Sequence, residues 1–86
     1  MNSHNLLMRN AKKQFVKKNK GLLDDFFGRL SNPKIYPAVF NEEFKNLRES
    51  TVAKRLIDKF TIFVGYGKST TFRDKFTVLY RTWKKI

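Results

Sequence analysis

The runs STVAKRLIDKF at residues 50–60, FTIFVGY at 60–66 and KFTVLYRTW at 75–83 decide the predicted fold. The first run has its apolar residues at helical spacing, whereas the other two alternate in steps of two and are rich in aromatic and β-branched side chains. Alternation of this kind is typical of strands. We therefore predict a short basic helix that leads into a C-terminal β-hairpin over residues 60–83, with the polar segment 67–75 as its exposed arm.

Two helices are predicted before this unit, within residues 5–30. Residues 5–19 combine apolar side chains at four-residue spacing with a basic polar face, which is typical of an amphipathic helix. Residues 22–30, LLDDFFGRL, are apolar on almost every side and predict a central core helix. Residues 1–4 are expected to fray.

A connector and a pair of helices are predicted between these two regions. Pro33 and Pro37 favour extended backbone in residues 31–40. Residues 41–59 predict a helix-turn-helix-like pair, because the apolar stripe changes phase at Ser50, whose hydroxyl can cap the second helix. A single bent helix is the alternative.

The predicted fold class is therefore α+β, in a single small basic domain over residues 1–86. A chain of 86 residues can form one domain with a modest core. Nine phenylalanines and 41% hydrophobic residues argue against a disordered polyelectrolyte. Three or four helices followed by two strands is the order of many winged helix-turn-helix domains, and this likeness is one of topology alone.

The formal net charge of +12 is concentrated at the two ends of the chain. Residues 1–20 carry +6 and residues 68–86 carry +5, whereas the 47 residues between them carry only +1. Phosphate polymers and anionic membrane surfaces are the usual partners of such charge. Because charge that serves only solubility would be spread evenly, this distribution favours a binding surface.

Several functional classes are excluded by composition. The chain has no cysteine, so it has neither a disulfide scaffold nor thiolate metal ligands. Its single histidine, His4, has no partner ligands in the sequence, and we expect no metal and no cofactor. No apolar run approaches the ~20 residues that span a bilayer. Because the N-terminus also lacks a signal-peptide core, we expect a cytoplasmic or nucleoid-associated protein.

Two enzymatic interpretations fit the residues poorly. YGKST at 66–70 is a partial match to the phosphate-binding loop, but Ile62 stands where that motif needs glycine and no helix is expected to follow. A metal-independent ribonuclease could use Tyr80, Arg81 and Lys84, but an alternating strand would place Tyr80 and Arg81 on opposite faces. We therefore expect a protein that is not an enzyme and has no catalytic residue.

The candidate binding residues serve two purposes. Thr51, Lys54 and Arg55 lie on the outer face of the predicted second helix of the pair, from which a recognition helix reaches base edges. The candidates for holding phosphates, on the hairpin arm and on the N-terminal helix, are Lys68, Arg73, Lys75, Lys12, Lys13 and Lys17. The sequence thus predicts a small nucleic-acid-binding module, transcription-regulator-like or architectural, for which duplex DNA is favoured over RNA. A homodimer is left open.

Three alternatives share the same composition. A small interaction protein, for example a viral one, could cover an acidic protein partner such as a polymerase or nuclease. An RNA-binding protein could stack Tyr66, Phe72 or Trp83 on unpaired bases. The basic helix at 5–19 could instead lie on an anionic membrane surface.

Overall fold

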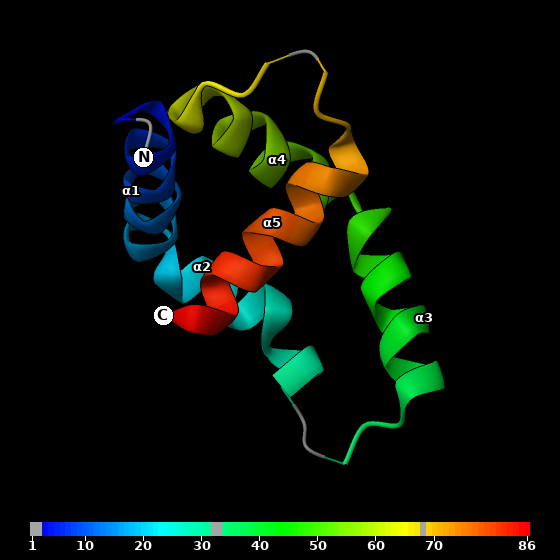
Figure 1. Cartoon of the computed structure of the whole chain (residues 1–86). Helices are drawn as coiled ribbons and strands as arrows, with labels where there is room; N and C mark the ends of the chain where they lie inside the picture. Colours follow the sequence, from blue (N-terminus) through cyan, green and yellow to red (C-terminus); the bar gives the residue numbers. More distant parts are fainter. Residues whose placement is uncertain (1–2, 32–33, 68) are drawn as a thin grey trace.

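The residues that the structure describes form a succession of helices, and none of them forms the predicted β-hairpin. The computed structural model describes residues 3–31, 34–67 and 69–86, with side chains from Arg9 onward. The elements are α1 (Ser3–Lys18), α2 (Lys20–Phe27), the 3-10 helix η1 (Gly28–Ser31), α3 (Pro37–Arg48), α4 (Thr51–Val64) and α5 (Phe72–Lys85) (Figure 1). None of the residues described lies in a strand. The predicted α+β class and its winged helix-turn-helix-like hairpin over 60–83 are therefore wrong, and the fold is all-helical.

Helices α1, α4 and α5 pack against one another in pairs and form the centre of the fold. Helix α2 supports α5, and α3 rests on α4 and η1. In Figure 1, α1 lies on one side of the molecule near the C-terminal end of α5, and α3 lies on the opposite side. Across the described ranges, no helix has the length and apolar character needed to cross a membrane.

The segment 72–83 fits a helical period as well as an alternating one, and burial distinguishes the two. Phe76, Leu79 and Tyr80 are all buried, and the sequence neighbours Leu79 and Tyr80 are only 0% and 8% exposed. A strand would turn two neighbours to opposite faces, whereas helical neighbours can share one side. The helix begins after Thr71, whose side-chain oxygen accepts a hydrogen bond from the Asp74 N–H at 3.1 Å.

Threonines that favoured a strand prediction are accommodated inside the helices. The hydroxyls of Thr61, Thr77 and Thr82 each donate to the carbonyl four residues earlier, at 2.6, 3.0 and 2.8 Å respectively. This hydrogen bond satisfies the hydroxyl while the residue stays in the helix, and it restricts the side-chain rotamer. The β-branched content of 60–83 is thus compatible with helix wherever burial favours it.

Gly65 ends α4 and turns the chain toward α5. Its φ of 76° lies in the left-handed region, which glycine adopts without strain. The N–H groups of Gly65 and Tyr66 both donate to the Thr61 carbonyl, at 2.9 and 3.2 Å, in a turn typical of helix ends. Of the segment 67–75 predicted as a hairpin arm, residues 72–75 form the first turn of α5, and the described residues before them lie between α4 and α5.

The expected break at Ser50 is present, whereas the start of the preceding helix differs from the prediction. The Ser50 side-chain oxygen accepts from the Ala53 N–H at 3.2 Å and caps α4. Helix α3 begins at Pro37 rather than near Asn41, since the fixed φ of proline suits a first helical position. The predicted connector over 31–40 is correspondingly shorter, and Pro33 lies outside the described residues.

The core combines side chains from both halves of the chain. Its buried members are Phe15, Val16, Leu23, Phe27, Leu30, Ala53, Leu56, Ile57, Phe60, Phe76, Leu79 and Tyr80. Phe27 contacts the rings of Phe76, Tyr80 and Trp83, with centroids 5.6, 5.3 and 5.4 Å away. Because α3 contributes only partly buried side chains, it is a cover over the aromatic cluster rather than part of the centre.

Replacing Phe27 with Ala should lower the free energy of unfolding by about 3–5 kcal/mol, because the ring is fully buried. Urea denaturation followed by circular dichroism at 222 nm measures this loss. Phe72→Ala is the matched control: Phe72 is 37% exposed, so we expect a loss of about 1 kcal/mol. Equal losses for the two variants would contradict the described core.

Two glycine-to-alanine substitutions should change stability in opposite directions. Gly65→Ala places a side chain at positive φ and should cost about 1–2 kcal/mol. Gly21 lies in α2, and a Cβ added there would meet no other atom within 4 Å. Gly21→Ala should therefore stabilise the protein by about 0.4–1 kcal/mol. Thermal melts of the two variants beside the parent provide the test, and a stabilising Gly65→Ala would disprove the left-handed turn.

Candidate functional site

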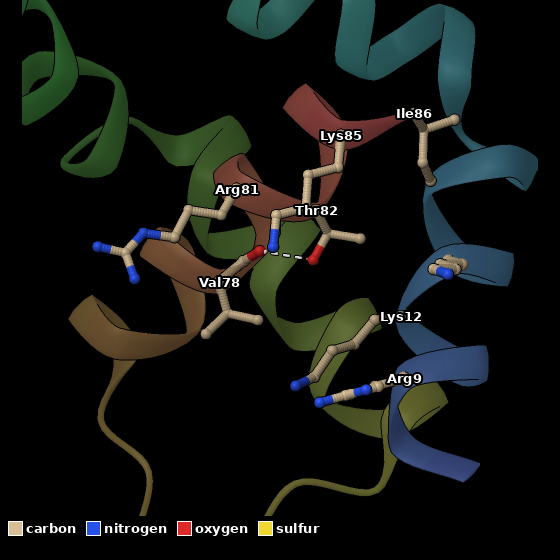
Figure 2. Close-up of a pocket in the computed structure, with 8 residues that line it drawn as sticks. Arg9, Lys12, Val78, Arg81, Thr82, Lys85 and Ile86 are labelled. Carbon is tan, nitrogen blue, oxygen red and sulfur yellow. Dashed lines mark hydrogen bonds between the residues drawn. The ribbon is translucent and has the colours of Figure 1, made fainter. Parts of the chain in front are cut away.

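An open groove of about 540 Å³ lies between α1 and α5, and we call it the α1–α5 groove. Its lining residues are Arg9, Lys12, Lys13, Val78, Arg81, Thr82, Lys85 and Ile86 (Figure 2). On α1, Lys12 and Lys13 lie three and four residues after Arg9; on α5, Arg81 and Thr82 lie three and four residues after Val78, and Lys85 lies four after Arg81. Each set therefore forms a stripe along one side of its helix.

The groove is strongly cationic. Five of its eight lining residues are Arg or Lys, and none is acidic. Among the described residues, the ion pair observed joins Lys20 to Asp24 at 3.6 Å within α2, away from the groove. No acidic side chain among the described residues pairs with the groove cations, which makes the site attractive to anions.

The two sides of the groove differ in what they present. Arg9 and Lys12 extend from α1 toward α5, whereas the Arg81 guanidinium points away from α1 (Figure 2). The Thr82 hydroxyl donates to the Val78 carbonyl at 2.8 Å, so its hydrogen is already used within α5. The polar contacts open to a ligand therefore come mainly from Arg and Lys side chains, with aliphatic Val78 between them.

The positive surface continues beyond the groove to the start of α5. The Lys12 ammonium lies over the Tyr66 ring, 5.6 Å from its centroid, and the Lys75 ammonium lies 5.8 Å from the same centroid. Burial raises the pKa of the Tyr66 phenol, so the group stays neutral well above physiological pH. Two lysines from different helices thus meet at one uncharged ring.

The predicted site residues occupy several places. Lys12 and Lys13 line the groove, and Lys75 joins them through Tyr66. Lys17 and Arg73 are exposed on α1 and α5 but do not line it. The proposed base-reading residues are exposed on α4, outside the groove: Thr51, Lys54 and Arg55. Lys68 lies outside the described residues.

Sequence reasoning missed Arg9, Arg81 and Lys85 as site residues. Arg9 was visible on the polar face of the first helix, but nothing in the sequence showed which side of that helix meets a partner. Arg81 and Lys85 lie about one turn apart on α5, but the predicted hairpin ended at residue 83 and left Lys85 outside it. The packing of α5 against α1, which the sequence did not show, is what places both residues in one groove with the α1 cations.

The aromatic residues considered for base stacking or catalysis at the end of α5 have structural roles. The Trp83 indole N–H donates to Asp24 Oδ1 at 2.8 Å and ties the end of α5 to α2. Tyr80, considered for a ribonuclease, is buried in the core, where its ring contacts Phe27 and Phe44. Among the described side chains, no group of three or more His, Cys, Asp or Glu could hold a metal ion.

The YGKST segment differs from the prediction in the element that follows it. A helix does follow the YGKST segment, because α5 begins at Phe72. Its first turn is capped by Thr71 and carries Asp74, whose negative charge already offsets the helix dipole. Helix α4, rather than a strand, precedes the segment, so the context that this motif requires is still absent.

Comparisons with known proteins identified no relative of this chain. The chain matches no protein-family model, no curated protein and no solved structure. A function therefore has to be inferred from the α1–α5 groove and its charges.

Removing two groove cations should leave the protein at least as stable as before, because it relieves like-charge repulsion. We expect Arg9→Gln with Lys85→Gln to reduce the rise in Tm between about 20 and 300 mM NaCl by about 1–3 °C, the size of a small electrostatic change in such a domain. Lys54→Gln with Arg55→Gln on α4 removes the same charge and is the control. A marked loss of stability in the groove variant would mean that these cations have a structural role.

Proposed function

We propose that this protein binds the phosphate backbone of duplex nucleic acid without sequence preference, through the α1–α5 groove. The observation that carries the proposal is the set of five Arg and Lys residues that line the groove from α1 and α5, with no acidic side chain among the lining residues. Each phosphate that meets an Arg or Lys releases condensed counterions, so such a surface has affinity for any sequence. Lys75 at the start of α5 would extend the contact.

The absence of aromatic residues from the groove lining favours a duplex over a single strand. Proteins that bind single strands stack the bases on exposed aromatic rings. Two of the three rings considered for stacking are engaged elsewhere: Trp83 contacts Asp24 and Phe27, and Tyr66 contacts Lys12 and Lys75. The third, Phe72, is 37% exposed but does not line the groove. A backbone track of cations with aliphatic Val78 between them suits phosphate and sugar better than exposed bases.

We expect the α4 side chains to contribute less to the recognition of bases than the sequence suggested. Without a wing, Thr51, Lys54 and Arg55 on α4 have no companion element to hold them over a groove of the duplex. These exposed side chains could add phosphate contacts from a second surface. The protein would therefore be architectural rather than a sequence-specific regulator, and it would act in the cytoplasm or on a nucleoid.

Fluorescence anisotropy with a 20-base-pair duplex, in DNA and RNA forms, and with a single strand of equal length tests the proposal. Five phosphate contacts predict a log–log salt slope between about −4 and −5, and weaker binding to the single strand. No binding to any nucleic acid at ~50 mM salt would reject the proposal and favour an acidic protein partner. Equal or tighter binding to the single strand would reject the preference for a duplex.

Two charge-matched variants locate the contact. The groove variant carries Arg9→Gln, Lys12→Gln and Lys85→Gln, and its salt slope should fall by about 3 in magnitude. The α4 variant carries Lys54→Gln, Arg55→Gln and Lys59→Gln, and should keep most of the parent slope. The reverse result would move the interface to α4.

A further inference from the structure

We infer that Tyr66 is a positioning residue for nucleic-acid binding: its ring holds Lys12 and Lys75 so that the phosphate-binding surface continues from the α1–α5 groove to the start of α5. This inference rests on the proposed function, because it concerns the same surface. It adds one uncharged residue, outside the groove lining, on which the placement of two cations depends.

The fold fixes the place of the ring. The left-handed Gly65 turns the chain at the end of α4. The hydrogen bond from the Tyr66 N–H to the Thr61 carbonyl then holds Tyr66 against the end of that helix. The Tyr66 ring then packs on Phe60, which is fully buried, with centroids 5.4 Å apart. The ring is therefore anchored to the core rather than to a flexible surface segment.

The ring in turn restrains two long side chains from separate helices. Since the two ammonium groups lie 5.6 and 5.8 Å from the shared centroid, they are no more than about 11 Å apart. Each duplex strand carries one phosphate per about 3.4 Å of axis, so the two lysines can serve phosphates within a few nucleotides of each other. Attraction to the ring face offsets their mutual repulsion in the unbound protein.

Restraint of this kind lowers the cost of binding. A free lysine side chain loses about 1.5–2 kcal/mol of rotamer entropy when it is fully immobilised. A lysine already held over a ring has lost part of that freedom before phosphate arrives. Its ammonium hydrogens that point away from the ring remain open to an anion.

The Tyr66 hydroxyl supplies a matched control. The hydroxyl oxygen is buried and has no hydrogen-bond partner among the described residues. Tyr66→Phe therefore removes an unsatisfied polar atom and keeps the ring, so both stability and lysine positions should be preserved. Tyr66→Leu keeps an apolar side chain on Phe60 but removes the aromatic face.

The first measurement needs no nucleic acid. Side-chain NMR of the parent should show upfield, ring-shifted Hε signals for Lys12 and Lys75. These shifts should persist in Tyr66→Phe and disappear in Tyr66→Leu. Unshifted signals in the parent, or shifts that survive in Tyr66→Leu, would overturn the inference whether or not the protein binds nucleic acid.

The second measurement is a double-mutant cycle on duplex affinity. Lys75→Gln should weaken binding about 2- to 5-fold more in the Tyr66→Phe background than in Tyr66→Leu, the effect of one exposed cation–π contact. Because Lys75→Gln is a surface change, the cycle does not depend on altered folding. Equal effects in both backgrounds would overturn the positioning role alone, whereas a parent that does not bind would also reject the proposed function.

Discussion

The packing of Phe27 against α5 is the interaction on which the rest of this structure depends. Its ring meets Phe76, Tyr80 and Trp83, and so holds α5 along nearly its whole buried length. Helix α1 packs on the other side of α5 and on α4, with Phe15 and Val16 in the core. With the two helices fixed by their apolar sides, Arg9 and Lys12 of α1 extend toward α5 across a groove that Lys85 also lines. The polar groove is thus a consequence of the apolar packing.

This arrangement explains why the charge is placed at the two ends of the chain. Residues 1–20 and 68–86 hold almost all of the excess charge, and they include α1 and α5 respectively. The fold brings these two segments side by side although more than half of the chain separates them. The mutual repulsion of like charges that are brought together from distant parts of a sequence opposes folding. An anionic polymer in the groove would remove that repulsion.

The sequence predicted the parts of the fold where only one periodicity is present. The cap at Ser50 followed from the phase change of the apolar stripe and from the serine hydroxyl, with a single bent helix as the alternative. Residues 22–30 were identified as helical, but the α-helix ends at Phe27 and the 3-10 helix η1 follows it. In 60–83, by contrast, Phe76, Val78 and Tyr80 alternate while Phe76, Leu79, Tyr80 and Trp83 follow a helix, and local propensity favoured the wrong pattern. The burial of both Leu79 and Tyr80 in the tertiary structure favours the helix over the strand. This burial depends on contacts with distant parts of the chain, so local sequence does not reveal it. Within the site, Lys12, Lys13 and Lys75 followed from charge alone, whereas Arg81 and Lys85 required knowledge of how α5 packs against α1.

The bond between Trp83 and Asp24 has an optical consequence. Trp83 is the single tryptophan of the chain, and it lies where α5 meets α2, beside Phe27 and Tyr80. Indole emission depends on solvent exposure and on hydrogen bonding of the ring nitrogen. All tryptophan fluorescence of this protein therefore originates at the junction that fixes α5. Separation of α5 from α2 would be visible in unlabelled protein as a change in one chromophore, distinct from any loss of helix elsewhere.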